Sequence, residues 1–386
     1  MQPAIQVISV ACAFCLALSA GNLSVPEKLI ADGHWKRARA IVEARFREAP
    51  DDPLANFLLS QIRFAFGDRE STLAFAEKAV ALDNGVAKYH RQVAEVLGVM
   101  AQHSNVWQQL VLARRFRKEI DLALMLDPFD IQASRDLMEF YLLAPGIAGG
   151  DPRKAAATAG RISSIHIAEG YLAQARLAEF HKQTQTVEEY LRKAAGSQPG
   201  YYLGHIALAR FDLALPNRNR DGAESEAREA IALDPDRVEA YSILAEVYAD
   251  RGSWTDLDAL LPASMSHVPD DLTPYYRAAE RLLETGRELP RAERYLRTYL
   301  TREAEGNEPA PAEAHWKLGL VLEKEARHAE AIAEWSESVR LDPASPASRD
   351  LKRLGHIRGA ARLPTFNTKP SQCSRLCDRA GLTMTA

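Results

Sequence analysis

An excess of charge of either sign is missing from this 386-residue sequence, and so are long apolar runs. The chain carries 48 lysines and arginines against 52 aspartates and glutamates, which gives a net charge of −4. This balance provides no basic footprint for a polyanion, so we expect no nucleic-acid partner. The hydrophobic share of 47% and the charged share of 26% exclude a disordered chain and a multi-span membrane protein.

The amino terminus carries one apolar stretch. Val7 to Ala20 is an uncharged run of 14 residues, which is too short to cross about 30 Å of hydrocarbon but suits the core of a signal peptide. Because small residues follow at once, we expect residues 1–20 to be a signal peptide and the protein to be exported to a periplasm or the extracellular space. The leader has no lysine or arginine, so an uncleaved membrane anchor and a misassigned start codon stay open as alternatives.

Cysteine is scarce, with four residues in the whole chain. Cys12 and Cys15 lie inside the apolar leader, and cleavage would remove both. The remaining pair, Cys373 and Cys377, is separated by three residues. In an oxidising compartment this pair would form one local disulfide or stay as free thiols.

A short phrase that ends in Leu-Asp-Pro or Leu-Asp-Asn recurs along the chain. It occupies residues 79–84, 123–128, 230–235 and 338–343. Proline cannot continue a helix and disfavours a helical conformation in the residue before it, so each copy predicts the end of one helix and the start of another. The steps from Pro50 to Asn84 and from Pro235 to Pro269 are both 34 residues. A period of 34 is typical of helical-hairpin repeats.

Residue spacing within the units agrees with this period. One unit has Tyr, Leu, Ala and Tyr at positions 241, 244, 245 and 248, and another has His, Leu, Gly and Leu at 315, 318, 319 and 322, followed by Ala331 and Trp335. Small residues such as Ala245 and Gly319 let two antiparallel helices approach closely. Over about residues 35–345 the sequence therefore resembles the tetratricopeptide repeat family, in an exported or envelope-associated form.

The resemblance implies an all-α fold, a right-handed α-solenoid of helix-turn-helix repeats with a concave inner surface. A partial repeat at 21–52 precedes about eight units in residues 53–345, and a capping helix at 346–359 and an irregular basic tail at 360–386 follow. The expected unit ranges are 53–86, 87–130, 131–167, 168–201, 202–237, 238–271, 272–311 and 312–345. Units longer than 34 residues are expected to carry insertions, among them one at Gly98 to Asn105.

Signatures of catalysis are missing. The sequence has no HExxH, GxSxG, GxxxxGK or paired CxxC motif, and no two histidines stand three or four residues apart as helical zinc ligands would. We therefore expect no enzymatic activity, no cofactor and no metal site. His315 occupies a position that packs repeats together, so we interpret it as structural.

In proteins similar to this one, the first helix of each repeat lines the concave groove, and particular positions on it point inward. Those positions give twelve candidate contacts for a protein or peptide partner. They are Phe57, Gln61, Phe64, Arg91, Arg135, Glu139, Arg176, Arg210, Glu246, Tyr276, Glu280 and Trp316. Arginine and aromatic residues are the usual anchors of such interfaces. Packing on a neighbouring helix is the alternative role for Phe57, Tyr276 and Trp316.

Two further segments stand out. The glycine-rich loop at 143–151 is either a grip for a partner or a flexible connection. Residues 346–386 have eight basic and two acidic residues, so this tail can contact acidic surfaces.

Taken as a resemblance, these features favour a non-catalytic scaffold or adaptor that binds a protein or peptide in the concave face of the solenoid. A membrane-tethered adaptor, held by an uncleaved N-terminal segment, is the alternative. A third possibility is an enzyme whose active site matches none of the motifs named above. The partner's identity and the oligomeric state do not follow from the sequence.

Overall fold

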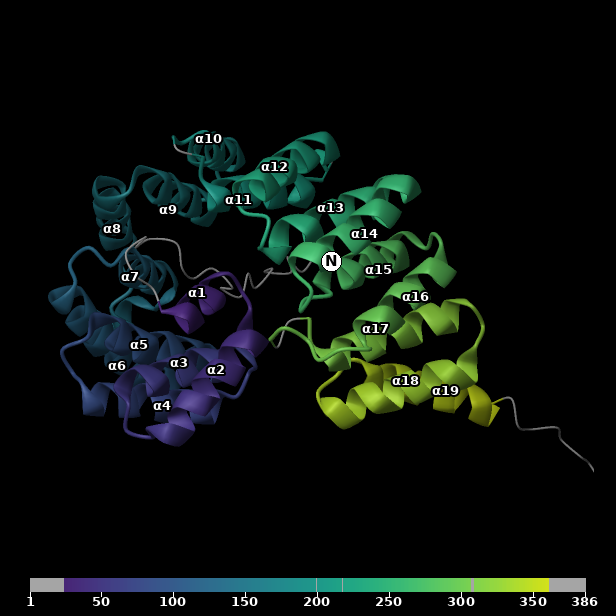
Figure 1. Cartoon of the computed structure of the whole chain (residues 1–386), viewed down its shortest axis with the longest axis horizontal. Coiled ribbons are helices and arrows are strands. Elements are labelled where there is room, and N and C mark those ends of the chain that lie inside the picture. Colours follow the sequence, from purple (N-terminus) through teal and green to yellow (C-terminus); the bar gives the residue numbers. More distant parts are fainter. Residues whose placement is uncertain (1–23, 199, 217, 307–308, 361–386) are drawn as a thin grey trace, which may run out of the picture.

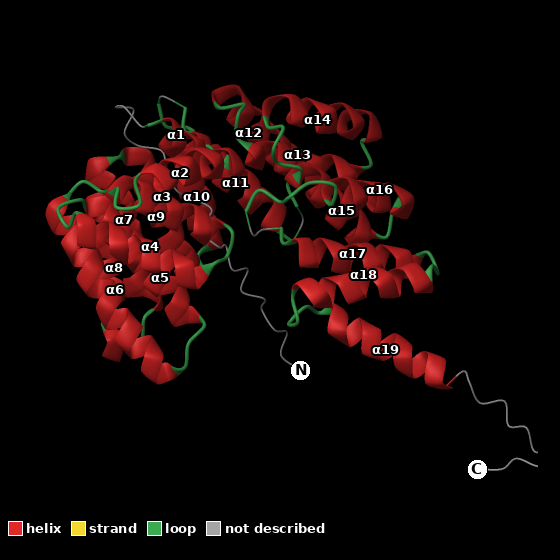
Figure 2. Cartoon of the chain, turned by 60° about the horizontal axis from the view of Figure 1, so that its bottom comes forward, coloured by secondary structure: helices red, strands yellow, loops and turns green. Residues whose placement is uncertain are grey.

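The computed structural model describes residues 24–198, 200–216, 218–306 and 309–360. In these ranges the chain forms nineteen α-helices, one short 3-10 helix and no strand (Figure 2). The expected all-α fold is therefore confirmed. The expected signal peptide and the pair Cys373 and Cys377 lie outside the described residues.

The helices alternate between the two sides of a curved layer (Figure 1). The inner helices are α1 (Val25–Ala31), α3 (Pro53–Ala65), α5 (Ala87–Gln102), α7 (Ile131–Leu143), α9 (Ile167–Phe180), α11 (Tyr202–Ala214), α13 (Val238–Arg251), α15 (Thr273–Thr285) and α17 (Pro311–Lys324). The outer helices are α2 (Trp35–Glu48), α4 (Arg69–Leu82), α6 (Val106–Leu126), α8 (Pro152–Ile165), α10 (Thr184–Ala195), α12 (Arg220–Leu233), α14 (Trp254–His267), α16 (Leu289–Tyr299) and α18 (His328–Leu341). The final helix, α19 (Ala347–Ala360), extends from the C-terminal end of the layer (Figure 2). Each of the eight residue ranges expected as repeats thus contains one inner and one outer helix, and no helix extends beyond its range by more than one residue.

The recurring Leu-Asp phrase ends helices by a side-chain turn. Each of its aspartates adopts an extended conformation at the helix end, and its carboxylate accepts a hydrogen bond from the backbone N–H two residues later. The four aspartates, with their N···O distances, are Asp83 (3.0 Å), Asp127 (2.9 Å), Asp234 (3.2 Å) and Asp342 (2.9 Å). The same short-range hydrogen bond therefore turns the chain at four repeat junctions.

Small residues bring the helices of a pair together, as the spacing predicted. A Cβ atom on Gly319 would lie 2.3 Å from Nε1 of Trp335, so the indole fits only against a glycine. That indole is fully buried and donates a hydrogen bond of 3.1 Å to the carbonyl oxygen of Trp316. Ala245 and Ala331 are also fully buried at helix crossings. Helix pairs of this type pack closely because the glycine or alanine at each contact has little or no side-chain volume.

The apolar core continues from repeat to repeat. Val80 packs against both of the first two clusters of buried residues, α9 contributes to both clusters in the middle, and Leu172 packs against the last two. The largest cluster runs from Tyr202 to Ala347. A shared core of this kind is expected of a solenoid in which each repeat buries the next. The predicted α-solenoid is therefore confirmed over the described residues.

Two insertions differ in form from the sequence expectation. The segment from Gly98 to Asn105 is mostly helical, because α5 continues to Gln102; α6 begins after it, at Val106, and is 21 residues long. The 143–151 loop contains η1 (Gly146–Ala148) and is closed by a hydrogen bond of 2.9 Å from the amide of Asp151 to the carbonyl of Tyr141. Gly150 is required there, since a Cβ atom would lie 1.8 Å from the carbonyl oxygen of Ala144.

The two ends of the curved layer of helices are in contact. The loop between α16 and α17 reaches α2, at the other end of the repeat array (Figure 1). We call the six charged residues at this contact the clasp; they are Lys36, Arg37, Arg39, Asp270, Glu303 and Glu305. No described helix is both long and apolar enough to span a membrane.

Candidate functional site

All twelve residues predicted for the concave face lie on inner helices. They are distributed from α3, which carries Phe57, Gln61 and Phe64, to α17, which carries Trp316. Their exposure differs widely, however, and divides them into three groups. One group forms a charged ladder along the groove, the second is packed into its wall, and the third, Phe64, Arg210 and Trp316, belongs to neither.

The ladder consists of ion pairs between successive inner helices. Arg176 on α9 donates two hydrogen bonds, of 2.7 and 3.0 Å, to the carboxylate of Glu139 on α7. Arg135 on α7 reaches Glu169 on α9 at 3.3 Å. Further along, Lys317 on α17 donates to Glu280 on α15 at 2.6 Å. These partners stand 34 or 37 residues apart, one repeat length, so the repeat period itself aligns opposite charges across each helix boundary.

Most members of this ladder are half-buried, and Glu169 is buried. Although burial raises the pKa of Glu280, Lys317 and Arg277 lower it by more, so the pKa of this carboxyl lies below its usual value. Burial lowers the pKa of Arg176, but its hydrogen bonds to Glu139 raise it above the usual value. Glu246 on α13 is half-buried and accepts a hydrogen bond of 2.6 Å from Arg218. The groove therefore presents fixed charges of both signs.

Four predicted contact residues form the wall instead. Phe57, Gln61, Arg91 and Tyr276 are buried, and in this conformation they present almost no surface to a partner. The ring of Phe57 lies 5.1 Å from that of Tyr89. The ring of Tyr276 lies 5.3 Å from that of Tyr299. Such pairs stabilise helix packing.

The other predicted aromatic and basic residues are more accessible. Phe64 is half-buried, and Arg210 is exposed by area although neighbouring groups still desolvate it, which lowers its pKa. Trp316 is half-buried, and its indole N–H donates a hydrogen bond of 2.9 Å to Asp350 of α19. It also lines a hollow with Glu313 and Pro346 near the C-terminal end. Trp316 therefore links the last repeat to the capping helix.

Acidic residues lie behind Arg91, and two of them, Asp130 and Asp136, escaped the sequence-based prediction. The guanidinium of Arg91 lies 3.8 Å from Glu95 and 3.7 Å from Asp130, the residue before α7. Burial raises the pKa of Asp136, and the charge of Glu95 raises it further. Burial likewise raises the pKa of Glu95, while Arg91 lowers it. These groups join α5 to α7 under the groove surface.

The first helix narrows the groove. Glu27 of α1 pairs with Lys88 of α5 at 2.6 Å. The pKa of Lys28 is raised first by a hydrogen bond to Asp32, and also by the charges of Asp234 and Asp236 in the loop between α12 and α13. Figure 1 shows α1 on the inner side of the curved layer.

The clasp is the second feature that narrows the groove. The ammonium of Lys36 donates to the backbone carbonyls of Asp270 and Glu303, each at 2.7 Å, and lies 3.1 Å from the carboxylate of Glu305. Glu305 also accepts a hydrogen bond of 2.6 Å from the backbone N–H of Lys36, so it caps the first turn of α2 from a distant part of the chain. Arg39 holds Glu303 with two hydrogen bonds, of 2.9 and 2.8 Å.

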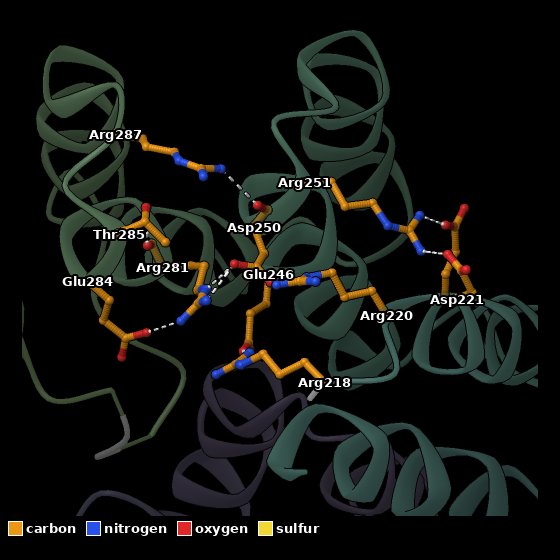
Figure 3. Close-up of polar contacts among 11 residues, drawn as sticks. Arg218, Arg220, Asp221, Glu246, Asp250, Arg251, Arg281, Glu284, Thr285 and Arg287 are labelled. Carbon is orange, nitrogen blue, oxygen red and sulfur yellow. Dashed lines mark hydrogen bonds and ion pairs between the residues drawn. The ribbon is translucent and has the colours of Figure 1, made fainter. Parts of the chain in front are cut away.

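A third charged cluster joins three repeats at the edge of the layer (Figure 3). Asp250 of α13 accepts hydrogen bonds from Arg220 of α12 and Arg281 of α15. Burial raises the pKa of Asp250, but these two arginines lower it below its usual value. Arg251 on the same helix pairs with Asp221 and Glu224. Every acid of this cluster is matched by an arginine, so its role is to hold α12, α13 and α15 together.

No group of His, Cys, Asp and Glu in the described part of the chain has a geometry that would hold a metal ion. His315, interpreted as structural, pairs through Nδ1 with Glu334 of α18 at 2.7 Å. His90 and His205 make the same contact, each with a glutamate of the paired outer helix at 2.7 Å. This recurring pair ties the two helices of a repeat together.

Comparison with known proteins supports the repeat assignment. A family model described as tetratricopeptide repeat matches residues 208–256 and 276–346. The match covers the repeats in which Tyr241, Gly319 and Trp335 occupy the expected positions. No curated protein sequence matches the chain.

Several solved structures are similar in fold. A tetratricopeptide repeat protein of Thermus thermophilus, TTC0263, has 17% identity and a TM-score of 0.43, covering 48% of this chain and 94% of its own. Yeast Tom70 has 12% identity and a TM-score of 0.46, covering 86% of this chain and 87% of its own. PilW, a type IV pilus biogenesis factor, has 18% identity and a TM-score of 0.42, covering 58% of this chain and 97% of its own. Identities this low concern the fold alone.

Proposed function

We propose that this protein is a non-catalytic scaffold or adaptor that binds a protein or peptide in its concave groove. The observation that carries the proposal is the ladder of half-buried ion pairs between successive inner helices. Solenoids use their extended concave surfaces for binding, and the ladder gives this surface fixed charges of alternating sign. A ligand that carries charges of both signs can form ion pairs with these side chains in place of the pairs that they form with one another.

The shape of the groove favours an extended chain over a folded domain. α1 lies on the inner side of the curved layer, and the clasp joins the two ends of the curve. A single peptide strand needs less room than a globular partner and can form contacts at every repeat. The accessible members of the predicted set are the residues we propose for contact. They are Phe64, Arg135, Glu139, Arg176, Arg210, Glu246 and Glu280.

Peptide display on the immobilised full chain tests this proposal. We expect selected peptides to lose about tenfold or more in affinity for Arg176→Glu, because the substitution reverses a groove charge and leaves Glu139 facing a second carboxylate. Arg192→Glu is the matched control, since Arg192 also pairs with a glutamate, Glu188, but on an outer helix. Peptides that bind both variants equally would refute the proposed contact surface.

We also propose that residues 1–20 are a signal peptide and that the protein acts after export, in a periplasm or outside the cell. The support is the short apolar run that ends before Gly21. The alternative adaptor would keep this segment as a membrane tether. Amino-terminal sequencing of the purified protein separates the two, because a chain that starts near Gly21 excludes the tether.

A further inference from the structure

The outer face of α6 exposes apolar side chains that a soluble protein normally covers. Trp107 is 80% exposed, and its neighbours Val106 and Val111 are 68% and 65% exposed. These residues begin the longest helix of the described chain, which with α5 forms a hairpin longer than those of the other repeats. Contiguous exposed apolar residues of this kind mark an interaction surface.

Basic residues continue the same face. Trp107, Val111, Arg114 and Lys118 follow one another at three- and four-residue steps, so they lie on one stripe of α6. Arg114 and Lys118 are exposed. Neither side chain has a hydrogen-bond or ion-pair partner within the ranges that the structure describes. Arg115 and Arg117 of the same helix, in contrast, are paired with Glu77 and Asp121.

The neighbouring outer helix extends this surface. α8 has three basic residues, Arg153, Lys154 and Arg161, and no acidic residue. Arg117 of α6 and Lys154 of α8 both lie over the ring of Tyr141 of α7, at 5.0 and 5.8 Å from its centroid, so the two helices come close at this point. Together α6 and α8 hold seven basic and two acidic residues, although the whole chain has a net charge of −4.

We propose that the outer face of α6 and α8 docks on an anionic lipid surface. Cations without partners attract anionic headgroups, and an exposed tryptophan beside them suits the boundary between headgroups and acyl chains. The described face has a single exposed tryptophan and no row of aromatic rings, which disfavours stacking on nucleic-acid bases. This surface lies on the side of the layer opposite the groove, so the proposal is independent of the groove's ligand (Figure 1).

Vesicle co-sedimentation of the full chain at low ionic strength tests the docking proposal. We expect binding to vesicles of phosphatidylcholine mixed with phosphatidylserine and weak binding to phosphatidylcholine alone. Each basic residue near an anionic surface contributes about fivefold in affinity, so Arg114→Gln with Lys118→Gln should lower binding about thirtyfold. Arg294→Gln with Lys324→Gln is the matched control, because it removes two exposed charges on α16 and α17, away from this face, and should change binding less than about twofold.

Fluorescence gives a second readout. Trp107 emission should shift to the blue on addition of anionic vesicles, and the Trp107→Phe variant should lose the shift. Equal binding to both vesicle types would assign the interaction to the apolar N-terminal segment and overturn the proposal. Binding that the glutamine pair leaves unchanged would overturn it as well. Preferential binding to a DNA duplex that competes with the vesicles would assign the surface to nucleic acid instead.

Discussion

Removal of the Lys36 ammonium should open the closed curve. In the Lys36→Met variant, the carboxylate of Glu305 loses the only ion-pair partner that it has among the described residues, while its side chain remains 1% exposed, and two backbone carbonyls lose their donor. Breaking a buried ion pair costs about 3–5 kcal/mol. Glu305 can offset part of this loss by binding a proton, since burial already raises its pKa to about 7. We therefore expect closure to weaken by about 2–3 kcal/mol at neutral pH.

Hydrogen–deuterium exchange measures this effect directly. Amides in the first turn of α2 and in residues 301–306 should exchange about 30- to 160-fold faster in the variant, because a change of about 2–3 kcal/mol in an opening equilibrium has that size. Lys193→Met is the control, since it removes an exposed ion pair with Glu189 at 2.6 Å and should leave both segments unchanged. Unchanged exchange in Lys36→Met would refute the role of the clasp in closing the curve.

Three further changes have defined outcomes. The pKa of Glu305 is raised from 4.5 to about 7, so the closed curve is stabilised when this carboxyl is protonated. This stabilisation should be fully present below about pH 4.5 and decrease by up to about 3 kcal/mol as the pH rises to about 7. Hydrogen exchange of the clasp segments, corrected for intrinsic rates, should show this trend in the native chain and lose it in Glu305→Gln. Gly319→Ala should destabilise the protein by about 1–3 kcal/mol in urea unfolding, because its Cβ atom would overlap the indole of Trp335. Gly160→Ala, at an open helical position, should instead stabilise the protein by up to about 1 kcal/mol. If Gly319→Ala proved the more stable of the two variants, the packing argument would be contradicted. Asp234→Ala should cost about 1 kcal/mol by removing the hydrogen bond that turns the chain after α12, and an unchanged urea midpoint would show that Pro235 alone makes the turn.

The repeat period determined much of the fold from sequence. The 34-residue step located the helix pairs, and Gly67 and Gly252 end their helices in the left-handed conformation, with φ of 77° at both positions. Such features depend on residues close together in the chain, so local spacing records them. The same spacing also placed the twelve groove candidates on inner helices.

The parts that escaped prediction depend on distant contacts. Lys36 and Glu305 are 269 residues apart and belong to no repeated phrase, so nothing in the sequence pairs them. Burial of Phe57 and Tyr276 depends on how closely adjacent repeats pack, so the sequence kept open both groove contact and packing for them, and the structure has them buried. The insertion at Gly98 to Asn105 interrupts the period, yet Met100, Ala101 and Gln102 within it are good helix formers, and they continue α5 to Gln102.

Photo-crosslinking of a selected peptide tests the central claim most directly. A peptide that carries photoreactive residues along its length should label the inner helices α7, α9, α11, α13 and α15 of the native chain, in an order that follows the repeats. It should label the Arg176→Glu variant much less than the Arg192→Glu variant. Labelling confined to outer helices, or equal labelling of both variants, would contradict the claim that the concave ladder is the binding surface.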